Sequence, residues 1–122
     1  RASMKKLTDG EWAVLRALWS APQLSLGEVT ARVQAETGWQ RNTVFTYLTR
    51  MEKKGLVHIE RGSAQPYRAA VSREDCAAAE REDLLRVYNG AAGELVAAFL
   101  RQSTISAEER DRLRQLLDEM EV

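Results

Sequence analysis

Apolar side chains recur three and four positions apart along the first half of the chain, a spacing that places them on one face of an α-helix. Three such stretches, separated by residues that end helices, predict helices over about 9–20, 26–36 and 41–54. In the third, Val44, Tyr47, Leu48 and Met51 follow one another at i, i+3, i+4 and i+7. We expect this face to be buried and the opposite face to be exposed.

Four of the predicted helix starts carry a capping-box pattern. In this pattern a Ser or Thr side chain and an acidic side chain three residues later satisfy free backbone N–H groups at the start of a helix. The pairs are Thr8 with Glu11, Ser25 with Glu28, Ser72 with Asp75, and Ser106 with Glu109. The pattern therefore fixes where four helices begin, including two in the second half of the chain.

The spacing changes to alternation after Gly55. Residues 56–61 read as a strand with Leu56, His58 and Glu60 on one side and with Val57, Ile59 and Arg61 on the other. Residues 62–65 form a turn, and 66–71 read as the returning strand, anchored by Tyr67. Because two strands alone are marginally stable in water, this β-hairpin must pack on the helices.

Residues 72–122 are predicted to be helical, over about 73–89, 92–102 and 106–120. Three helices of this length are too short of apolar residues to close a core of their own. We expect their apolar stripes to meet a second copy of the chain in a two-fold dimer. The residues predicted for dimerisation are Leu84, Leu85, Tyr88, Leu95, Val96, Phe99, Leu100, Leu113, Leu116, Leu117 and Met120. The alternative is a monomer in which these helices cap the N-terminal half.

Three helices followed by a hairpin are the element order of a winged helix-turn-helix, whose third helix enters the DNA major groove. The predicted fold is therefore mainly α with a small β-hairpin. It comprises an N-terminal winged-helix domain over 1–72 and a C-terminal helical dimerisation region over 73–122. Residues 1–3 precede Met4 and are interpreted as a tag remnant.

Composition and charge agree with a nucleic-acid partner and argue against several other classes. The 122 residues carry 18 Lys and Arg against 18 Asp and Glu, but residues 1–71 hold 11 basic and 6 acidic side chains, whereas residues 72–122 hold 7 and 12. A basic half is typical of polyanion binding. A single cysteine and a single histidine cannot build a Cys/His metal site, so we expect no metal and no cofactor. The lone cysteine, and the lack of a secretory signal or a long apolar run, predict a cytoplasmic protein without membrane insertion.

The polar face of the third predicted helix suits a DNA groove, because its side chains are amides, hydroxyls and cations. By their chemistry, the predicted base contacts are Asn42, Phe45, Thr46 and Thr49. The predicted phosphate contacts are Arg41, Thr43, Arg50, Lys53, Lys54, Arg61 and Arg68, the last two in the hairpin. Phosphate contacts position a protein on DNA, and base contacts select the sequence.

At this point the sequence resembles the penicillinase-repressor family (the BlaI/MecI/CopY type). The resemblance is dense over about 7–75 and looser from Leu95 to Leu117. It rests on the order and spacing of Leu7-Thr8-Asp9-Gly10-Glu11-Trp12, Val14-Leu15, Leu18-Trp19, Gly38-Trp39, Asn42-Thr43-Val44, Thr46-Tyr47-Leu48, Arg50-Met51, Lys53-Lys54-Gly55-Leu56, and Tyr67 followed by Val71-Ser72-Arg73-Glu74.

The resemblance implies a homodimeric bacterial repressor that binds dyad-symmetric promoter DNA, controlling a β-lactam-response or related sensor-protease operon. In the penicillinase branch, signalling by a membrane-bound sensor metalloprotease leads to cleavage in the dimerisation region. The matching bond is Ala98–Phe99, although members with that mechanism carry Asn before the Phe. The copper-binding branch carries C-terminal Cys-x-Cys motifs, and this chain has no cysteine after Cys76.

Three other readings stay open from the residues. A winged helix can be a protein-interaction module that binds no DNA, although its third helix would then present an apolar or acidic face. The chain can also be a ligand-responsive winged-helix regulator of another family. An enzyme is the third reading, and the sequence contains no P-loop, no GxGxxG and no nucleophile elbow to support it. We expect no catalytic residues.

Overall fold

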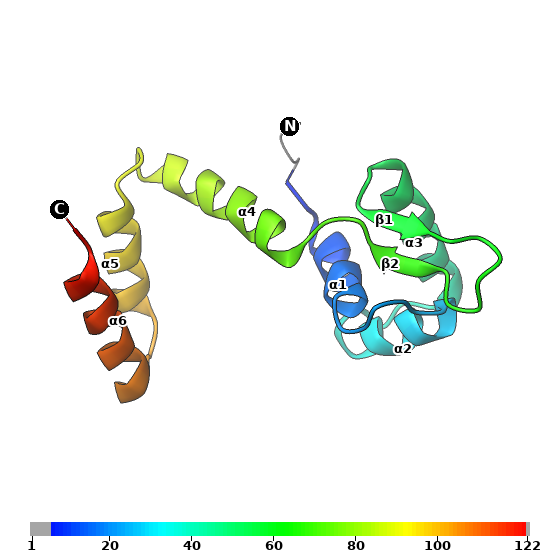
Figure 1. Cartoon of the computed structure of the whole chain (residues 1–122), viewed down its shortest axis with the longest axis horizontal. Coiled ribbons are helices and arrows are strands. Elements are labelled where there is room, and N and C mark those ends of the chain that lie inside the picture. The colour runs from blue at the N-terminus through cyan, green and yellow to red at the C-terminus, as the bar shows by residue number, and fades with distance from the viewer. Residues whose placement is uncertain (1–5, 122) are drawn as a thin grey trace. The chain divides into compact units, whose positions relative to one another are not determined.

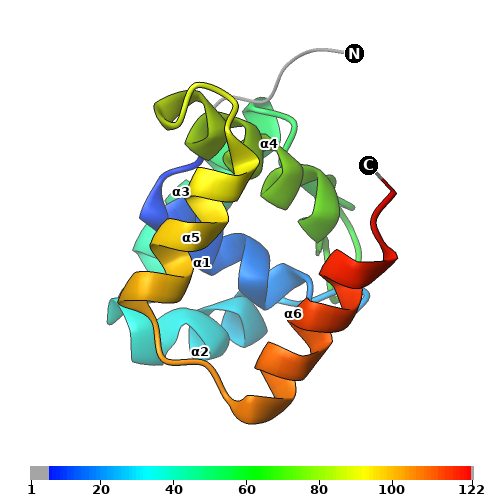
Figure 2. The ribbon, with the colours of Figure 1, turned by 90° about the vertical axis from the view of Figure 1, so that its left-hand side faces the viewer.

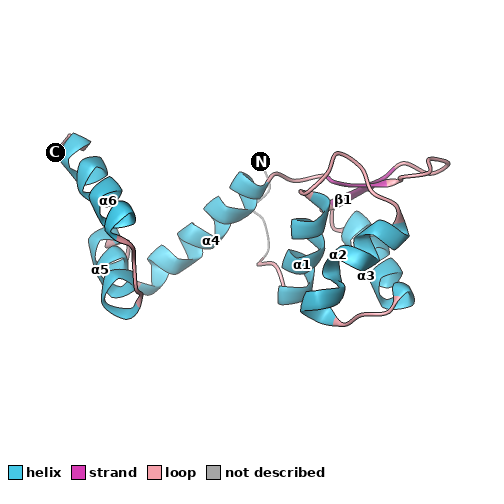
Figure 3. Ribbon diagram, turned by 90° about the horizontal axis from the view of Figure 1, so that it is seen from below, coloured by secondary structure: helices cyan, strands magenta, loops and turns pink. Residues whose placement is uncertain are grey.

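The computed structural model describes residues 6–121, so the predicted tag remnant lies outside the described residues. Its elements follow the predicted order (Figures 1 and 3). They are α1 (Asp9–Leu18), α2 (Leu26–Thr37), α3 (Arg41–Lys53), β1 (Val57–Ile59), β2 (Tyr67–Ala69), α4 (Arg73–Val87), α5 (Ala92–Gln102) and α6 (Ala107–Glu119). The fold class, mainly α with a small β-hairpin and a winged-helix arrangement in the first part, is confirmed.

The predicted capping residues set the helix starts. The boxes of Thr8, Ser25 and Ser106 are complete in both directions. The Ser72 hydroxyl accepts a hydrogen bond from the backbone N–H of Asp75 at 3.0 Å. Helix ends are less well predicted, since α1 and α4 each end about two residues earlier than their apolar spacing indicates.

The chain divides into two compact units, residues 1–80 and residues 81–122. The division falls inside α4 rather than before it. Each unit is described by itself below.

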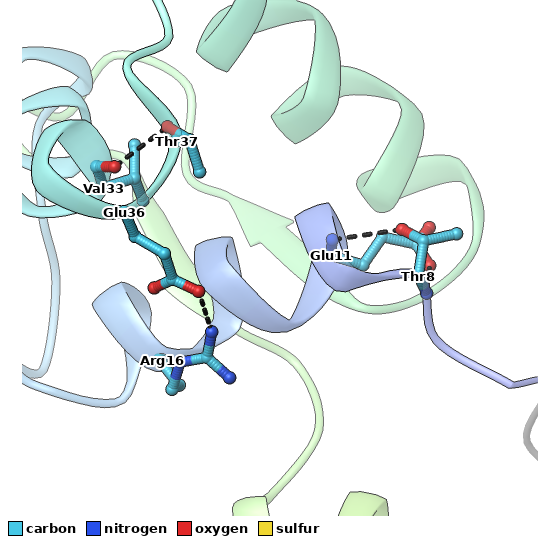
Figure 4. Close-up of polar contacts among 6 residues, drawn as sticks. All are labelled: Thr8, Glu11, Arg16, Val33, Glu36 and Thr37. Carbon is cyan, nitrogen blue, oxygen red and sulfur yellow. Dashed lines mark hydrogen bonds and ion pairs between the residues drawn. The ribbon is translucent and has the colours of Figure 1, made fainter.

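The first unit has one hydrophobic core, enclosed by α1, α2, α3 and the hairpin. The side chains at its centre are at most 2% exposed; they are Ala13, Val14, Leu15, Leu18, Leu24, Val29, Val33, Val44, Leu48, Met51 and Cys76. Figure 4 draws the pair that joins Arg16 of α1 to Glu36 of α2, together with the Thr8–Glu11 cap at the start of α1 and the bond from the Thr37 hydroxyl to the Val33 carbonyl in α2.

The hairpin strands pair antiparallel, with Val57 opposite Ala69 and Ile59 opposite Tyr67. Outside the hairpin, Leu24 and Tyr67 exchange two backbone hydrogen bonds of 2.9 and 3.0 Å, which add a one-residue third strand. This bridge joins the segment before α2 to the returning strand. Nothing in the local sequence pattern predicts it, because it depends on how the two segments are brought together.

Leu56 was predicted to share a side with His58, and this prediction is wrong. Leu56 is 7% exposed and His58 is exposed. Leu56 lies in the turn before β1, where its N–H donates to the Met51 carbonyl while Gly55 donates to the Glu52 carbonyl. This Schellman ending of α3 requires the left-handed φ of +80° at Gly55, and it turns the Leu56 side chain into the core.

The first turns of α4 pack on the first unit. Cys76 is 1% exposed, and burial raises the pKa of its thiol, so it is an inert core residue rather than a reactive thiol. The Trp12 indole N–H donates to Glu80 at 3.4 Å. The Arg73 guanidinium stacks over Trp19, whose indole N–H donates to the Val71 carbonyl at 2.9 Å. Trp12 and Trp19 also contact edge to face, so both are packing residues.

The second unit contains the end of α4 with α5 and α6, and neither α5 nor α6 has a buried residue. The two helices diverge from the loop that joins them (Figure 2). Their apolar side chains therefore remain accessible within that unit.

Candidate nucleic-acid interface

The apolar face of α3 is buried in the first unit. Val44 and Leu48 are 0% exposed and Met51 is 1% exposed. Tyr47, which the spacing placed on the same face, is half-buried at its edge. Burial of three residues spaced around two turns fixes the rotation of the helix about its axis, so the opposite face must point to solvent.

That opposite face, which we call the α3 outer face, carries most of the predicted DNA contacts. Its exposed members are Arg41, Asn42, Thr43, Phe45, Thr46, Arg50 and Lys53, and Thr49 is half-buried beside them. Glu52 is the one acidic residue of α3, and it lies half-buried rather than exposed. The face therefore presents cations, an amide and hydroxyl-bearing side chains with no exposed carboxylate.

Phe45 is 50% exposed on this face. A large aromatic ring among charged neighbours gains nothing from water, and nothing in the first unit covers it. Its position beside Asn42 and Thr46 suits contact with an apolar group, such as a thymine methyl, in a groove.

Two of the three threonine hydroxyls of the face donate back into the helix. Thr46 Oγ1 donates to the Asn42 carbonyl and Thr49 Oγ1 to the Phe45 carbonyl, each at 3.0 Å. Because the hydroxyl protons are used internally, these side chains offer a methyl group and an acceptor oxygen rather than a donor. Asn42 carries the amide of the face, and an amide can donate to and accept from one base edge at the same time.

The start of α3 differs from the starts of α1 and α2. Its N-cap, Gln40, makes no side-chain capping bond, and its first turn contains no acidic residue. The helix dipole places partial positive charge at this end, and Arg41 adds a full one. The end is electrostatically suited to a phosphate.

Two contacts from α1 hold α3 in place. Tyr47 stacks on Trp39, with ring centroids 4.2 Å apart. Gly10 of α1 lies against this stack so closely that an added Cβ would come within 2.6 Å of the Tyr47 hydroxyl and 2.7 Å of the Trp39 ring. Any larger residue at Gly10 would push α3 away from α1.

The second contact is an ion pair between Lys54, just after α3, and Glu11 of α1. Lys54 Nζ lies 2.6 Å from Glu11 Oε2, and the Glu11 residue is 5% exposed. Burial acts to raise the Glu11 pKa, but the bonds from Lys54 and Thr8 outweigh it, so the pKa lies below its ordinary value. Lys54, predicted as a phosphate contact, thus has a protein carboxylate as its partner.

Glu11 itself was not singled out from the sequence as an ion-pair partner. A signal was present, because Glu11 precedes Val14, Leu15 and Leu18 at the spacing of the buried stripe of α1. A carboxylate in a buried register needs a cation or several donors. The identity of that cation could not be read, since Lys54 is distant in sequence.

The hairpin cations differ from one another. Arg61 binds Glu52 with both guanidinium branches, at 2.8 and 2.9 Å. The Arg61 hydrogen bond lowers the Glu52 pKa and raises that of Arg61. Arg68 is exposed on β2, opposite His58. The loop between the strands is tied to α2 by a 2.9 Å bond from Gln65 to Glu28, and Glu60 accepts from Gln23 at 3.1 Å.

The predicted dimerisation residues are accessible within the second unit. Those with exposed fractions from 36% to 62% are Leu84, Val96, Phe99, Leu100, Leu113, Leu116, Leu117 and Met120. Leu85, Tyr88 and Leu95 are half-buried. Ala98 is half-buried and Phe99 is 54% exposed, and both lie inside α5.

Two other kinds of feature are absent from residues 6–121. No group of three or more His, Cys, Asp or Glu side chains there is arranged to hold a metal ion. Nor is any helix there both long enough and apolar enough to cross a membrane.

Known proteins resemble the chain over part of its length. An uncharacterised 16.5 kDa protein from the ptsI 3′ region of Latilactobacillus sakei is 32% identical over 56 residues, covering 46% of this chain and 38% of that protein. The methicillin resistance regulatory protein MecI of Staphylococcus aureus (strain N315) is 27% identical over 52 residues, covering 43% and 42%. The matched segment thus spans about two-fifths of the length of these relatives.

Solved structures show a similar arrangement. The monomeric form of Bacillus licheniformis BlaI, in complex with the blaP half-operator, has a TM-score of 0.49 and 25% identity, covering 58% of this chain and 88% of that chain. The PcaV regulator of Streptomyces coelicolor has a TM-score of 0.45 and 22% identity, covering 96% and 79%.

A family model extends the likeness over nearly the whole sequence. The model of the penicillinase repressor matches residues 7–119, which includes the three helices, the hairpin and all of α4, α5 and α6. The chain therefore belongs to the penicillinase repressor family.

Proposed function

We propose that this chain is a bacterial transcriptional repressor that binds dyad-symmetric promoter DNA as a homodimer. The observation that carries the proposal is the α3 outer face, which is exposed, cationic and free of exposed carboxylates while the opposite face is buried. Membership of the penicillinase repressor family supports the same function. Such a repressor works beside the chromosome, in the cytoplasm, and needs no catalytic group.

In this proposal each protomer lays α3 in a major groove. Asn42 reads a base edge through paired hydrogen bonds, and Phe45, Thr46 and Thr49 contact thymine methyls. Arg41, Thr43, Arg50 and Lys53 bind phosphates and set the register. Repression follows because the bound protein occupies promoter DNA that polymerase needs.

The proposed dimer rests on the second unit. Eight of its predicted dimerisation residues are exposed, and a second copy would cover them. A two-fold dimer would place two copies of α3 about 34 Å apart, one helical turn of DNA. The acidic excess of this half keeps it away from phosphates.

Fluorescence anisotropy with a labelled duplex tests the DNA proposal. Six to ten phosphate contacts per complex would lower the affinity by roughly three to five decades between about 50 and 200 mM salt. A matched protein with Arg41 and Arg50 replaced by Gln should bind more weakly and show a shallower slope of log affinity against log salt. A flat slope for the unchanged chain would exclude the proposal.

Light scattering at micromolar concentration tests the dimer. We expect the mass of two chains, and the mass of one chain after Leu116→Glu and Leu117→Glu together. Glu at two exposed positions of the other face of α6, Arg112→Glu and Gln115→Glu, is the control and should leave the mass unchanged. A monomer at all concentrations would contradict the proposal.

The proposal includes release by a membrane-bound sensor metalloprotease circuit that leads to cleavage at Ala98–Phe99. Cleavage there would separate α6 and the end of α5 from the rest of the chain. Six of the eight exposed residues proposed for the dimer would be lost, while the α3 outer face would be unchanged. Mass spectrometry of the chain recovered from cells after β-lactam treatment should show a fragment ending at Ala98, and the intact chain alone would exclude this route.

A further inference from the structure

Two of the six cations predicted for phosphates already bind carboxylates of the protein. Lys54 pairs with Glu11 and Arg61 pairs with Glu52. The two pairs have similar lengths, 2.6 Å and 2.8 Å, but they differ in the burial of the carboxylate. That difference decides whether DNA can compete for the cation.

The Lys54 pair is locked. The Glu11 side chain is 7% exposed, so removal of Lys54 would leave a carboxylate without a cation in a place that water hardly reaches. Such a group is strongly unfavourable. A phosphate therefore cannot draw Lys54 away without disturbing the joint between α1 and α3.

The Arg61 pair is exchangeable. The Glu52 side chain is 29% exposed and that of Arg61 is 69% exposed, so water can solvate both if they separate. Exposed pairs of this kind add little to folding stability. A DNA phosphate offers two unesterified oxygens to a guanidinium, as a carboxylate offers its two, and Arg binds both groups with paired hydrogen bonds.

Position makes this pair relevant to DNA. Glu52 is the one carboxylate in α3, and it binds Arg61, the cation nearest the start of the hairpin loop. The loop is held close to the helices by the Gln65–Glu28 bond as well. The hairpin is therefore held near the helices, and the charge of its Arg61 is neutralised by Glu52.

We propose that Glu52 competes with DNA phosphate for Arg61. By holding the Arg61 guanidinium, Glu52 limits the affinity of the repressor for DNA. This rests on the proposed DNA-binding function. In the unchanged protein bound to a duplex of arbitrary sequence, Arg61 stays on Glu52 and contributes no phosphate contact. Neutralising Glu52 frees the guanidinium, and one further phosphate contact forms in each protomer.

Four full-length proteins test this: the unchanged chain, Glu52→Gln, Arg61→Ala and the double variant. Each is titrated by anisotropy into the same mixed-sequence duplex over a series of salt concentrations. Glu52→Gln should bind roughly three- to tenfold more tightly near 100 mM salt, with a slope steeper by about 0.9 per protomer, the value for one added phosphate contact. In the Arg61→Ala background, the same substitution should leave the slope unchanged.

Glu60→Gln is the matched control. It removes a carboxylate from the same hairpin whose partner is the amide of Gln23 rather than a cation. Binding within about twofold of the unchanged chain is expected. Thermal unfolding of all five proteins should agree within a few degrees, since each change is at an exposed or solvated site.

The outcomes separate the two proposals. If the unchanged chain binds no duplex, the proposed function fails. If it binds, two results would show that Glu52 acts as an ordinary surface charge and that this inference is wrong. The first is that Glu52→Gln steepens the salt slope as much in the Arg61→Ala background as in the unchanged chain. The second is that Glu60→Gln has the same effect as Glu52→Gln. Weaker binding by Glu52→Gln would also overturn it, since the carboxylate would then help Arg61 to reach DNA.

Discussion

The two units of the chain use apolar residues in opposite ways. In residues 1–80 the large aliphatic side chains of α1, α2 and α3 are sealed, with Leu15 and Leu48 at 0% exposure. In residues 81–122 the same residue type lies open, with Leu116 at 55% and Leu117 at 62%. The first unit has the core of an independent domain, and the second has the surface of an incomplete one.

The polar residues differ in the same way. In the first unit, an ion pair and a hydrogen bond link elements that are distant in sequence, as Lys54–Glu11 and Gln65–Glu28 do. The second unit contains local contacts, such as the Ser106–Glu109 cap and the Arg86–Asp83 pair. Long-range contacts define a unique tertiary arrangement, whereas local ones stabilise helices whatever their partners are. The comparison predicts that the first unit folds alone and that the second needs a copy of itself.

The largest expected effect contrasts two leucines. Leu48→Ala should lower the free energy of unfolding of the first unit by about 2–5 kcal/mol, because it opens a cavity in a closed core. Leu117→Ala should change that free energy by less than about 0.5 kcal/mol. All three tryptophans, Trp12, Trp19 and Trp39, lie in the first unit, so urea titrations followed by tryptophan fluorescence report on that unit. Equal losses for both leucines would show that the units share one core.

Truncation inside α4 sharpens the boundary between the units. A chain ending at Glu80 should unfold cooperatively, whereas one ending at Ser72 should be less stable by about 2 kcal/mol, since it loses the burial of Cys76 and the stacking of Arg73 on Trp19. Urea titration of both fragments measures this. Equal stability would mean that the first turns of α4 belong to the second unit alone.

Asn42→Ala separates base reading from assembly. It should weaken binding to a selected high-affinity duplex by about 1–3 kcal/mol and leave binding to an unrelated duplex nearly unchanged. Gln34→Ala, at an exposed polar position of α2, serves as the control with no effect on either. Competition anisotropy measures both affinities, and an equal loss on the two duplexes would show that Asn42 reads no base.

The smallest expected effect concerns pH and the Glu11–Lys54 pair. The Glu11 pKa is lowered from its ordinary value of 4.5, so the unfolded state binds the proton more readily. The stability from this pair is complete above that ordinary value and is lost as pH falls through the lower folded pKa. Glu11→Gln should cost about 1 kcal/mol at neutral pH, and less as the pH falls below 4.5.

Glu36→Gln is the control for this pH dependence, because its partner Arg16 and Glu36 itself are both solvated. Its unfolding free energy should follow that of the unchanged chain at every pH. A constant difference between Glu11→Gln and the unchanged chain down to the acid limit would show that the Glu11 charge does not contribute.

Local patterns in the sequence predicted much of the first unit. Apolar spacing placed Val44, Leu48 and Met51 on one buried face, and the capping residues fixed the starts of α1, α2 and α6. Both signals act within one or two turns, so a linear reading can detect them. The same spacing left the α3 outer face exposed, as expected.

The remainder depends on long-range geometry. The Leu24–Tyr67 bridge, the Lys54–Glu11 pair and the packing of Cys76 each join segments that only the folded chain brings together. For the candidate site, the sequence identified the cations but not which of them are already paired. Lys54 and Arg61 looked like Arg50 and Lys53 because the partners Glu11 and Glu52 have no fixed spacing to them in sequence.

The most direct test of the central claim is an NMR footprint of the full chain on a duplex. We predict that backbone amide shifts change most over Arg41–Lys53 on titration, at the exposed positions Asn42, Thr46 and Arg50, with little change in α6. The opposite pattern, with α3 unchanged and the shifts confined to α1, α5 or α6, would contradict the account.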